Sequence, residues 1–280
     1  MENITRTIYG SLLQTCLLLK LTHSIAENST LNERFGVQQN VMPDANQLPS
    51  MGYYVIGNGG HTWSVGAAGM GVPTPVQHRG TDASCYSPIP FVLREQNNDL
   101  STTERAKYAL RRTETHNGKS YFAYYARRMD LSAVKAVAEL MRVADDVTTI
   151  APFVPDSSNL NPTPPAIVPD SVNVVSGDYV AATAKIGLVL SDTDVNELIN
   201  VAKVIYGDER YAIVSEVGLV TGVDKFVSSA GPNNTTINQN EVIASQIASF
   251  VNVFWPLAYN RKEAGVLLDL GATEPLFTLE

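Results

Sequence analysis

The sequence predicts an α+β protein, with a strand-rich N-terminal region and a C-terminal α+β domain that contains two amphipathic helices. Three observations favour this class. The pair Asn117-Gly118, between segments rich in arginine and aromatic residues, is a strong β-hairpin signal. Apolar residues recur at helical spacing in residues 191–206 and again in 240–255. Strand-like apolar runs flank both segments, which gives the C-terminal order β-β-α-β-α-β.

The domain organisation follows from length and composition. A chain of 280 residues is enough for one large domain or two ordinary ones. Residues 1–50 are predicted to form an N-terminal arm, with a short amphipathic helix in 11–21, and residues 51–151 a strand-rich domain. Six of the 15 prolines fall in 152–169, and proline is excluded from helix and sheet interiors. This segment is predicted to be a linker to an α+β domain at 170–280.

Local signals place elements in the strand-rich domain. Residues 53–56 are predicted as a strand, and the glycine-rich stretch that follows, up to residue 75, as loop. Ser101 and Glu104 have the spacing of a helix capping box. Residues 133–141 suit a helix, whereas 147–154 suit a strand.

The predicted turn at Asn117-Gly118 sets the register of the hairpin. Pairing outward places Thr113 opposite Phe122, Arg111 opposite Tyr124, and Leu110 opposite Tyr125. An arginine over a tyrosine ring adds a cation–π attraction of about 0.5–2 kcal/mol. Aromatic residues fall on both faces of this ribbon, so one face is expected to pack on the core and the other on a neighbouring subunit. The predicted interface residues are Arg111, Phe122, Tyr124, Tyr125, Arg127 and Arg128. The alternative is a plain core hairpin with solvated arginines.

The C-terminal domain is expected to begin with two strands in residues 172–191. A helix follows, capped by Ser191 or Asp192 and ended by Gly207. A strand at 210–222, the second helix at 240–255 and a final strand at 264–271 complete the domain.

No motif in the chain indicates catalysis, and the sequence predicts a non-enzymatic protein without a cofactor. Gly57, Gly59 and Gly60 lack the spacing of a phosphate-binding loop. One candidate metal set consists of His61, His78, Asp82 and Cys85, but the spacing of these residues is not diagnostic of a metal site. The pair Asp145-Asp146 suits either the two carboxylates of glycoside cleavage or, more simply, a solvated loop.

Composition bears on the partners. The isoelectric point is about 5.0, which disfavours nucleic acid as a partner. The sequence contains no run of 18 apolar residues, so no membrane partner is predicted. Two cysteines are too few for a disulfide scaffold, so folding in the cytosol is expected. Residues 94–142 carry 10 Lys/Arg and 6 Asp/Glu, a net charge of +4, whereas 143–280 carry 6 and 17, a net charge of −11. This asymmetry favours head-to-tail contact between copies, although uneven charge is also common on solvated surfaces.

Four segments together resemble a family of virion structural proteins of tailed bacteriophages. They are MGYYVIGNGGH (51–61), PFVLREQNNDLSTTERAKYALRRTETHNGKSYFAYYARRMDL (90–131), YGDERYAIVSEVGLVTGVDK (206–225) and GATEPLF (271–277). The resemblance implies a structural component, made in the bacterial cytoplasm and assembled into the tail, baseplate or neck of the virion. Its partners would be other copies of itself and other phage structural proteins. The alternatives are a head-surface decoration or adhesion protein and a particle-associated glycan hydrolase.

Overall fold

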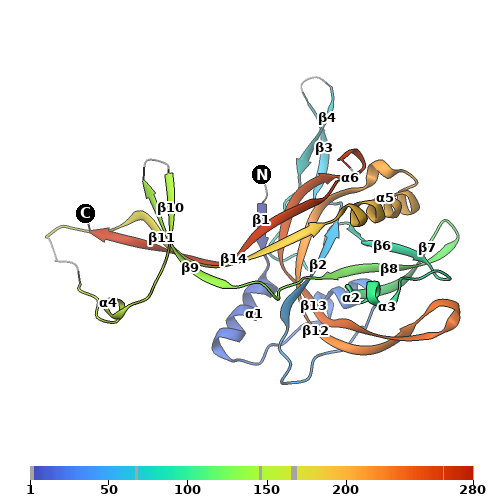
Figure 1. Ribbon diagram of the computed structural model, residues 1–280, viewed down its shortest axis with the longest axis horizontal. Helices are drawn as coiled ribbons and strands as arrows, with labels where there is room; N and C mark the ends of the chain where they lie inside the picture. Colours follow the sequence, from blue (N-terminus) through green and yellow to red (C-terminus); the bar gives the residue numbers. More distant parts are fainter. Residues whose placement is uncertain (1–2, 67–68, 145–146, 165–168, 261, 280) are drawn as a thin grey trace. The chain divides into compact units, whose positions relative to one another are not determined.

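The computed structural model describes residues 3–66, 69–144, 147–164, 169–260 and 262–279, and the chain forms two compact units (Figure 1). Unit 1 comprises Met1–Asp130 and Leu190–Ala264. Unit 2 comprises Leu131–Val189 and Gly265–Glu280. The proline-rich segment 152–169 therefore lies within unit 2.

The protein is mostly β, with 51% of its residues in strands and 19% in helices, so the predicted α+β class is wrong. Unit 1 is built on an eight-stranded antiparallel sheet with the path β1-β13-β12-β2-β8-β6; β5 pairs with β2, and β7 with β8. Its strands are β1 (Asn3–Arg6), β2 (Ser50–Gly57), β5 (Pro88–Ile89), β6 (Val92–Glu95), β7 (Tyr108–His116), β8 (Lys119–Arg128), β12 (Ile213–Ala230) and β13 (Thr236–Pro256).

The predicted second amphipathic helix, residues 240–255, is wrong because this segment is part of strand β13. Its residues from Glu241 to Val253 are all buried, so the strand lacks the alternation of a half-exposed strand. The register with β12 shifts between Leu219 and Val220 and again between Thr221 and Val223. Such bulges add residues to one strand and interrupt its two-residue period. The resulting apolar spacing resembles that of a helix.

The hairpin at Asn117-Gly118 is confirmed as β7 and β8, and both turn residues have positive φ, 49° and 76°. The predicted pairs of Thr113 with Phe122 and of Arg111 with Tyr124 are confirmed. The third pair is wrong, because a register shift next to Arg111 places Leu110 opposite Ala126.

Helices are short apart from α1 (Ile8–Leu19) and α5 (Asp192–Tyr206). The predicted caps of α5 are confirmed: Ser191 and Asp194 form a capping box, and Gly207 ends the helix with φ 76°. The capping box of Ser101 with Glu104 is also confirmed. The remaining helices of unit 1 are α2 (Leu31–Phe35), α3 (Thr102–Arg105), α6 (Leu257–Asn260) and the 3-10 turns η1 (Glu27–Ser29), η2 (Glu209–Tyr211) and η3 (Pro232–Asn234). Among the described residues, no helix is long and apolar enough to cross a membrane.

The core of unit 1 joins α2 and α5 to the main sheet. Its cluster of buried side chains includes Leu31 and Phe35 of α2, Val201 of α5, and Val55 and Phe250 of the sheet. The glycine-rich residues predicted as loop instead contain a separate two-stranded hairpin, β3 (His61–Val65) with β4 (Gly71–Pro75).

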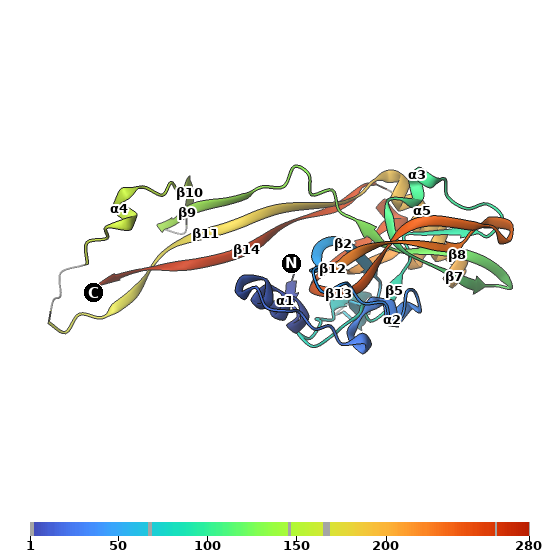
Figure 2. The same ribbon diagram turned by 90° about the horizontal axis from the view of Figure 1, so that it is seen from below.

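Unit 2 contains a four-stranded antiparallel sheet in the order β10-β9-β11-β14, and Figure 2 shows β11 and β14 running side by side. Its elements are β9 (Ala136–Ala144), β10 (Val147–Pro152), α4 (Ser157–Leu160), β11 (Asn173–Leu190) and β14 (Ala264–Leu279). The helix suggested for residues 133–141 is wrong, because 136–144 form β9. The two strands expected in 172–191 are one long strand, β11.

Candidate functional site

The sheet of unit 2 exposes apolar side chains on both of its faces. Ile150 lies opposite Met141, which lies opposite Tyr179, so these three residues share one face. Val147 lies on the other face, because it is three positions from Ile150 along the strand and successive side chains alternate between faces. Ile150 is 58% exposed and Val147 60%. All four residues of α4, the one helix in the described part of unit 2, are exposed, so α4 does not bury either face.

The two edge strands of this sheet are β10 and β14. On β14, Leu267 and Phe277 are 66% and 60% exposed. An edge strand presents backbone donors and acceptors that can pair with another chain. The sheet therefore offers two kinds of contact to a partner, apolar faces and open edges.

The hairpin residues predicted as a subunit interface lie mainly in the interior of unit 1. Arg111, Phe122, Tyr124 and Tyr125 are 7%, 1%, 1% and 5% exposed. Tyr125 stacks on Phe35 of α2, with 4.3 Å between ring centroids. These four residues are core residues of this chain, as in the alternative of a plain core hairpin, and they leave little surface for a neighbouring subunit.

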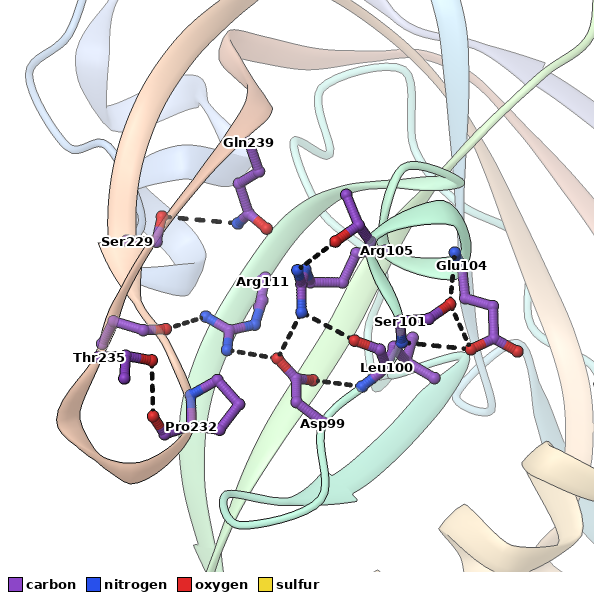
Figure 3. Close-up of polar contacts among 12 residues, drawn as sticks. Asp99, Leu100, Ser101, Glu104, Arg105, Arg111, Ser229, Pro232, Thr235 and Gln239 are labelled. Carbon is purple, nitrogen blue, oxygen red and sulfur yellow. Dashed lines mark hydrogen bonds and ion pairs between the residues drawn. The ribbon is translucent and has the colours of Figure 1, made fainter.

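Arg111 is the centre of a buried polar cluster, shown in Figure 3 facing Asp99. Its Nη2 donates to Asp99 Oδ2 at 2.8 Å, and its Nη1 donates to the carbonyl of Ala230 at 2.5 Å. Its guanidinium carbon lies 3.5 Å from the ring centroid of Phe122 and 5.9 Å from that of Tyr124. The closer cation–π partner is therefore Phe122, not the predicted Tyr124. Burial, together with the hydrogen bond to Asp99, raises the pKa of Tyr124 well above its ordinary value.

The other two predicted interface residues form ion pairs within unit 1. Arg127 lies 2.7 Å from Asp194 of α5, and Arg128 lies 2.7 Å from Asp224 of β12. The hydroxyl of Tyr53 also donates to Asp224, at 2.7 Å. Both arginines thus attach the hairpin to neighbouring elements of the same unit.

An open pocket of about 820 Å³ lies beside the β3–β4 hairpin of unit 1. Six aromatic side chains line it: His61, Trp63, Tyr206, Tyr211, Phe254 and Tyr259. Four of its polar lining residues are Asn58, Ser87, Asp208 and Arg210. Trp63 and Tyr259 are 58% and 75% exposed, so the pocket presents uncovered aromatic surface.

A buried carboxylate holds two of the loops that line this pocket. Glu216 is 0% exposed, and its Oε1 accepts hydrogen bonds from the backbone N–H groups of Gly59 at 2.6 Å and Ser87 at 3.2 Å. Its Oε2 accepts from the N–H of Tyr86 at 2.7 Å and lies 2.7 Å from Nε2 of His78. The three backbone N–H groups and His78 together compensate the carboxylate for the hydration that it loses on burial.

The candidate metal set does not form a metal site. His78 lies 3.1 Å from Asp82, but no group of three or more His, Cys, Asp or Glu that could hold a metal is found in the described ranges. Burial raises the pKa of the Cys85 thiol far above its ordinary value. The pair Asp145-Asp146 lies outside the described residues.

Sequence reasoning missed the pocket and the exposed faces of unit 2. The alternation of His61, Trp63 and Val65 with Thr62 and Ser64 is a strand signal, which the surrounding glycines concealed. The pocket residues come from segments about 150 positions apart, and no local pattern joins them.

Comparison with known proteins identifies one family. Its sequence model, described as "Family of unknown function (DUF7208)", matches residues 1–280, and the chain belongs to this family. Comparisons with curated proteins and with solved structures give no match.

Proposed function

We propose that this protein is a non-enzymatic structural subunit of a tailed bacteriophage particle, assembling through protein–protein contacts in the tail, baseplate or neck. The observation that carries the assembly role is the sheet of unit 2, with exposed apolar side chains on both faces. The tailed-phage assignment is supported by the four segments that resemble virion structural proteins. The partners in this proposal are other copies of the chain and other phage structural proteins, and its location is the virion.

The physical argument concerns the stability of a thin sheet in water. A small antiparallel sheet needs at least one face covered by other apolar groups. Full burial of a side chain such as Ile150 or Val147 contributes about 1.5–3 kcal/mol. A second subunit packed on either face would therefore stabilise unit 2, and the open edge of β14 would allow strand pairing in addition.

Helix α1 supports the same role. Leu13 and Cys16 are buried, whereas Ile8, Leu12 and Leu19 are 56%, 48% and 59% exposed. Their spacing of four and seven residues places them along one side of the helix. An exposed apolar stripe on a surface helix is typical of a protein contact.

Charge contributes less to the proposal than apolar surface. The basic residues 94–142 and the acidic residues 143–280 would attract one another between copies. However, Arg111, Arg127 and Arg128 already form ion pairs within the chain.

Light scattering on the purified protein tests the assembly surface. We expect an oligomer of defined mass, built from 30.3 kDa chains, that dissociates in the variants Ile150→Lys and Val147→Lys. The control Ser157→Lys places the same charge on exposed α4 and should leave the mass unchanged. Circular dichroism would verify that each variant stays folded.

Quantitative mass spectrometry of purified virions tests the particle assignment. A copy number of about six, twelve or a small multiple, as expected for a cyclic assembly, supports a tail, baseplate or neck subunit. Hundreds of copies would instead support head-surface decoration. A monomeric chain that is absent from particles and binds no virion protein would refute the proposal.

A further inference from the structure

The open pocket of unit 1 combines aromatic surface with hydrogen-bonding groups. Trp63, Tyr211 and Tyr259 are 58%, 55% and 75% exposed, although large aromatic side chains usually bury most of their surface. Nδ2 of Asn58 donates to the hydroxyl of Tyr206 at 3.0 Å, which links the two side chains at the pocket wall. Such a surface suits a ligand with one apolar face and polar edges.

The charges near this pocket are paired with one another. Arg210 donates to Asp208 at 2.6 Å, and Lys203 lies 2.9 Å from Glu209. Burial lowers the pKa of His61 below its ordinary value, although the charge of Glu216 opposes this shift. At neutral pH these groups balance, which favours an uncharged ligand over a phosphate or a carboxylate.

The loop that carries Asn58 is bound by Glu216, and its glycines allow it to lie close to Glu216 and Ser215. A Cβ atom on Gly59 would lie 2.9 Å from Oε1 of Glu216, and one on Gly60 would lie 2.4 Å from the carbonyl oxygen of Ser215. Only glycine permits this close approach. Binding sites are stronger when the groups that contact the ligand are fixed in advance.

We propose that this pocket binds a neutral saccharide. A pyranose ring has a face of C–H groups that can stack on Trp63 or Tyr259, and hydroxyl groups at its edge that can pair with Asn58 and Asp208. A wholly apolar ligand would displace water from the remaining hydrogen-bonding positions of these polar side chains without replacing it, at a cost in affinity. The pocket lies entirely within unit 1, so this inference does not depend on the assembly role.

Binding of the full-length protein to an array of plant, animal and bacterial saccharides tests the proposal. The strongest saccharide would then be titrated by calorimetry. We expect affinity to fall by roughly tenfold or more in Trp63→Ala and in Tyr259→Ala, as is usual for aromatic anchors. The control Phe226→Ala removes an aromatic side chain that is 70% exposed on β12, away from the pocket lining, and should bind like the parent protein.

Two results would overturn the proposal. One is the absence of binding to every saccharide on the array by protein that is folded. The other is binding that Trp63→Ala and Tyr259→Ala leave unchanged, which would place the saccharide elsewhere. If the pocket is instead covered by another copy of the chain, these two variants would change the mass measured by light scattering and not the binding of any saccharide.

Discussion

The imidazole of His78 stacks on the ring of Phe250, with 3.6 Å between centroids and 8° between planes, while its Nε2 lies 2.7 Å from the buried carboxylate of Glu216. The side chains of His78 and Glu216 are 1% and 0% exposed. A polar pair this deep in a protein stabilises the fold only when its remaining hydrogen-bonding positions are filled. Here the backbone N–H groups of residues 59, 86 and 87 fill those of Glu216, and Asp82 lies 3.1 Å from Nδ1 of His78.

The first prediction concerns this pair. Glu216→Gln replaces an oxygen acceptor with an NH₂ group that faces backbone donors, so at least one buried N–H loses its partner. We expect the free energy of unfolding to fall by about 3–5 kcal/mol, as when one member of a buried polar pair is removed. Urea denaturation followed by tryptophan fluorescence measures the change. Glu263→Gln, at an exposed position, should behave like the parent protein; a loss below about 1 kcal/mol in Glu216→Gln would contradict the role of Glu216.

The second prediction concerns the turn of the β7–β8 hairpin. Gly118 has φ 76°, a conformation that disfavours any residue with a Cβ atom. Gly118→Ala should therefore lower the free energy of unfolding by about 1–2 kcal/mol. The matched control is Gly52→Ala on β2, where a Cβ atom would meet nothing within 4 Å, and which should be neutral or slightly stabilising. Equal losses in the two variants would show that the turn conformation does not matter.

The third prediction concerns Arg111. Arg111→Met keeps much of the apolar stem over Phe122 but removes the cation 2.8 Å from the buried carboxylate of Asp99, which leaves Arg105 at 3.3 Å. The free energy of unfolding should fall by about 1.5–3 kcal/mol, the typical contribution of a hydrogen bond to a charged group. The double variant Arg111→Met, Asp99→Asn should recover part of that loss, because the buried carboxylate that lost its nearer cation is then neutral. Lys119→Met, at an exposed ion pair, is the control and should have no measurable effect.

Double-variant stabilities decide whether the cluster acts as a unit. If the losses of Arg111→Met and Asp99→Asn simply add, then the two side chains do not stabilise one another, and the 2.8 Å contact between them contributes little.

The elements that the sequence predicted correctly have local signals. The turn at Asn117-Gly118 requires positive φ, and α5 carries its cap at Ser191 and its stop at Gly207 within one segment. Strand β13 has no such signal, because burial on both faces removes the alternation and bulges alter the spacing. Its single positive φ at Ala244 could not be anticipated from the residue type.

The candidate site was less predictable than the fold. The sequence indicated a hairpin with aromatic residues on both faces, but it did not reveal that both faces would be covered by the same chain. Asp194 and Asp224, which neutralise Arg127 and Arg128, lie far along the sequence. The contacts of Glu216 span more than 125 positions, and nothing near Glu216 in the sequence indicates them.

The last prediction concerns acid stability. Burial alone would raise the pKa of Asp194, but the hydrogen bond and the charge of Arg127, together with hydrogen bonds from Ser191, hold that pKa below its ordinary value. The folded state thus keeps Asp194 ionised to lower pH than the unfolded state does. This contribution to stability is fully present above the ordinary aspartate pKa of about 3.9 and is lost as the pH falls through the lower value of the folded state.

Removing this carboxylate should therefore flatten the response of the protein to acid. Asp194→Asn should be less stable than the parent protein at pH 7 and should lose less further stability between pH values of about 5 and 3. Urea denaturation at a series of pH values measures both effects, with Asp269→Asn, an exposed aspartate of unit 2, as the control that should follow the parent curve. If the curves of Asp194→Asn and the parent protein run parallel over this range, the ion pair with Arg127 does not contribute to the acid response. The 2.7 Å contact between α5 and the hairpin would then be held by packing alone.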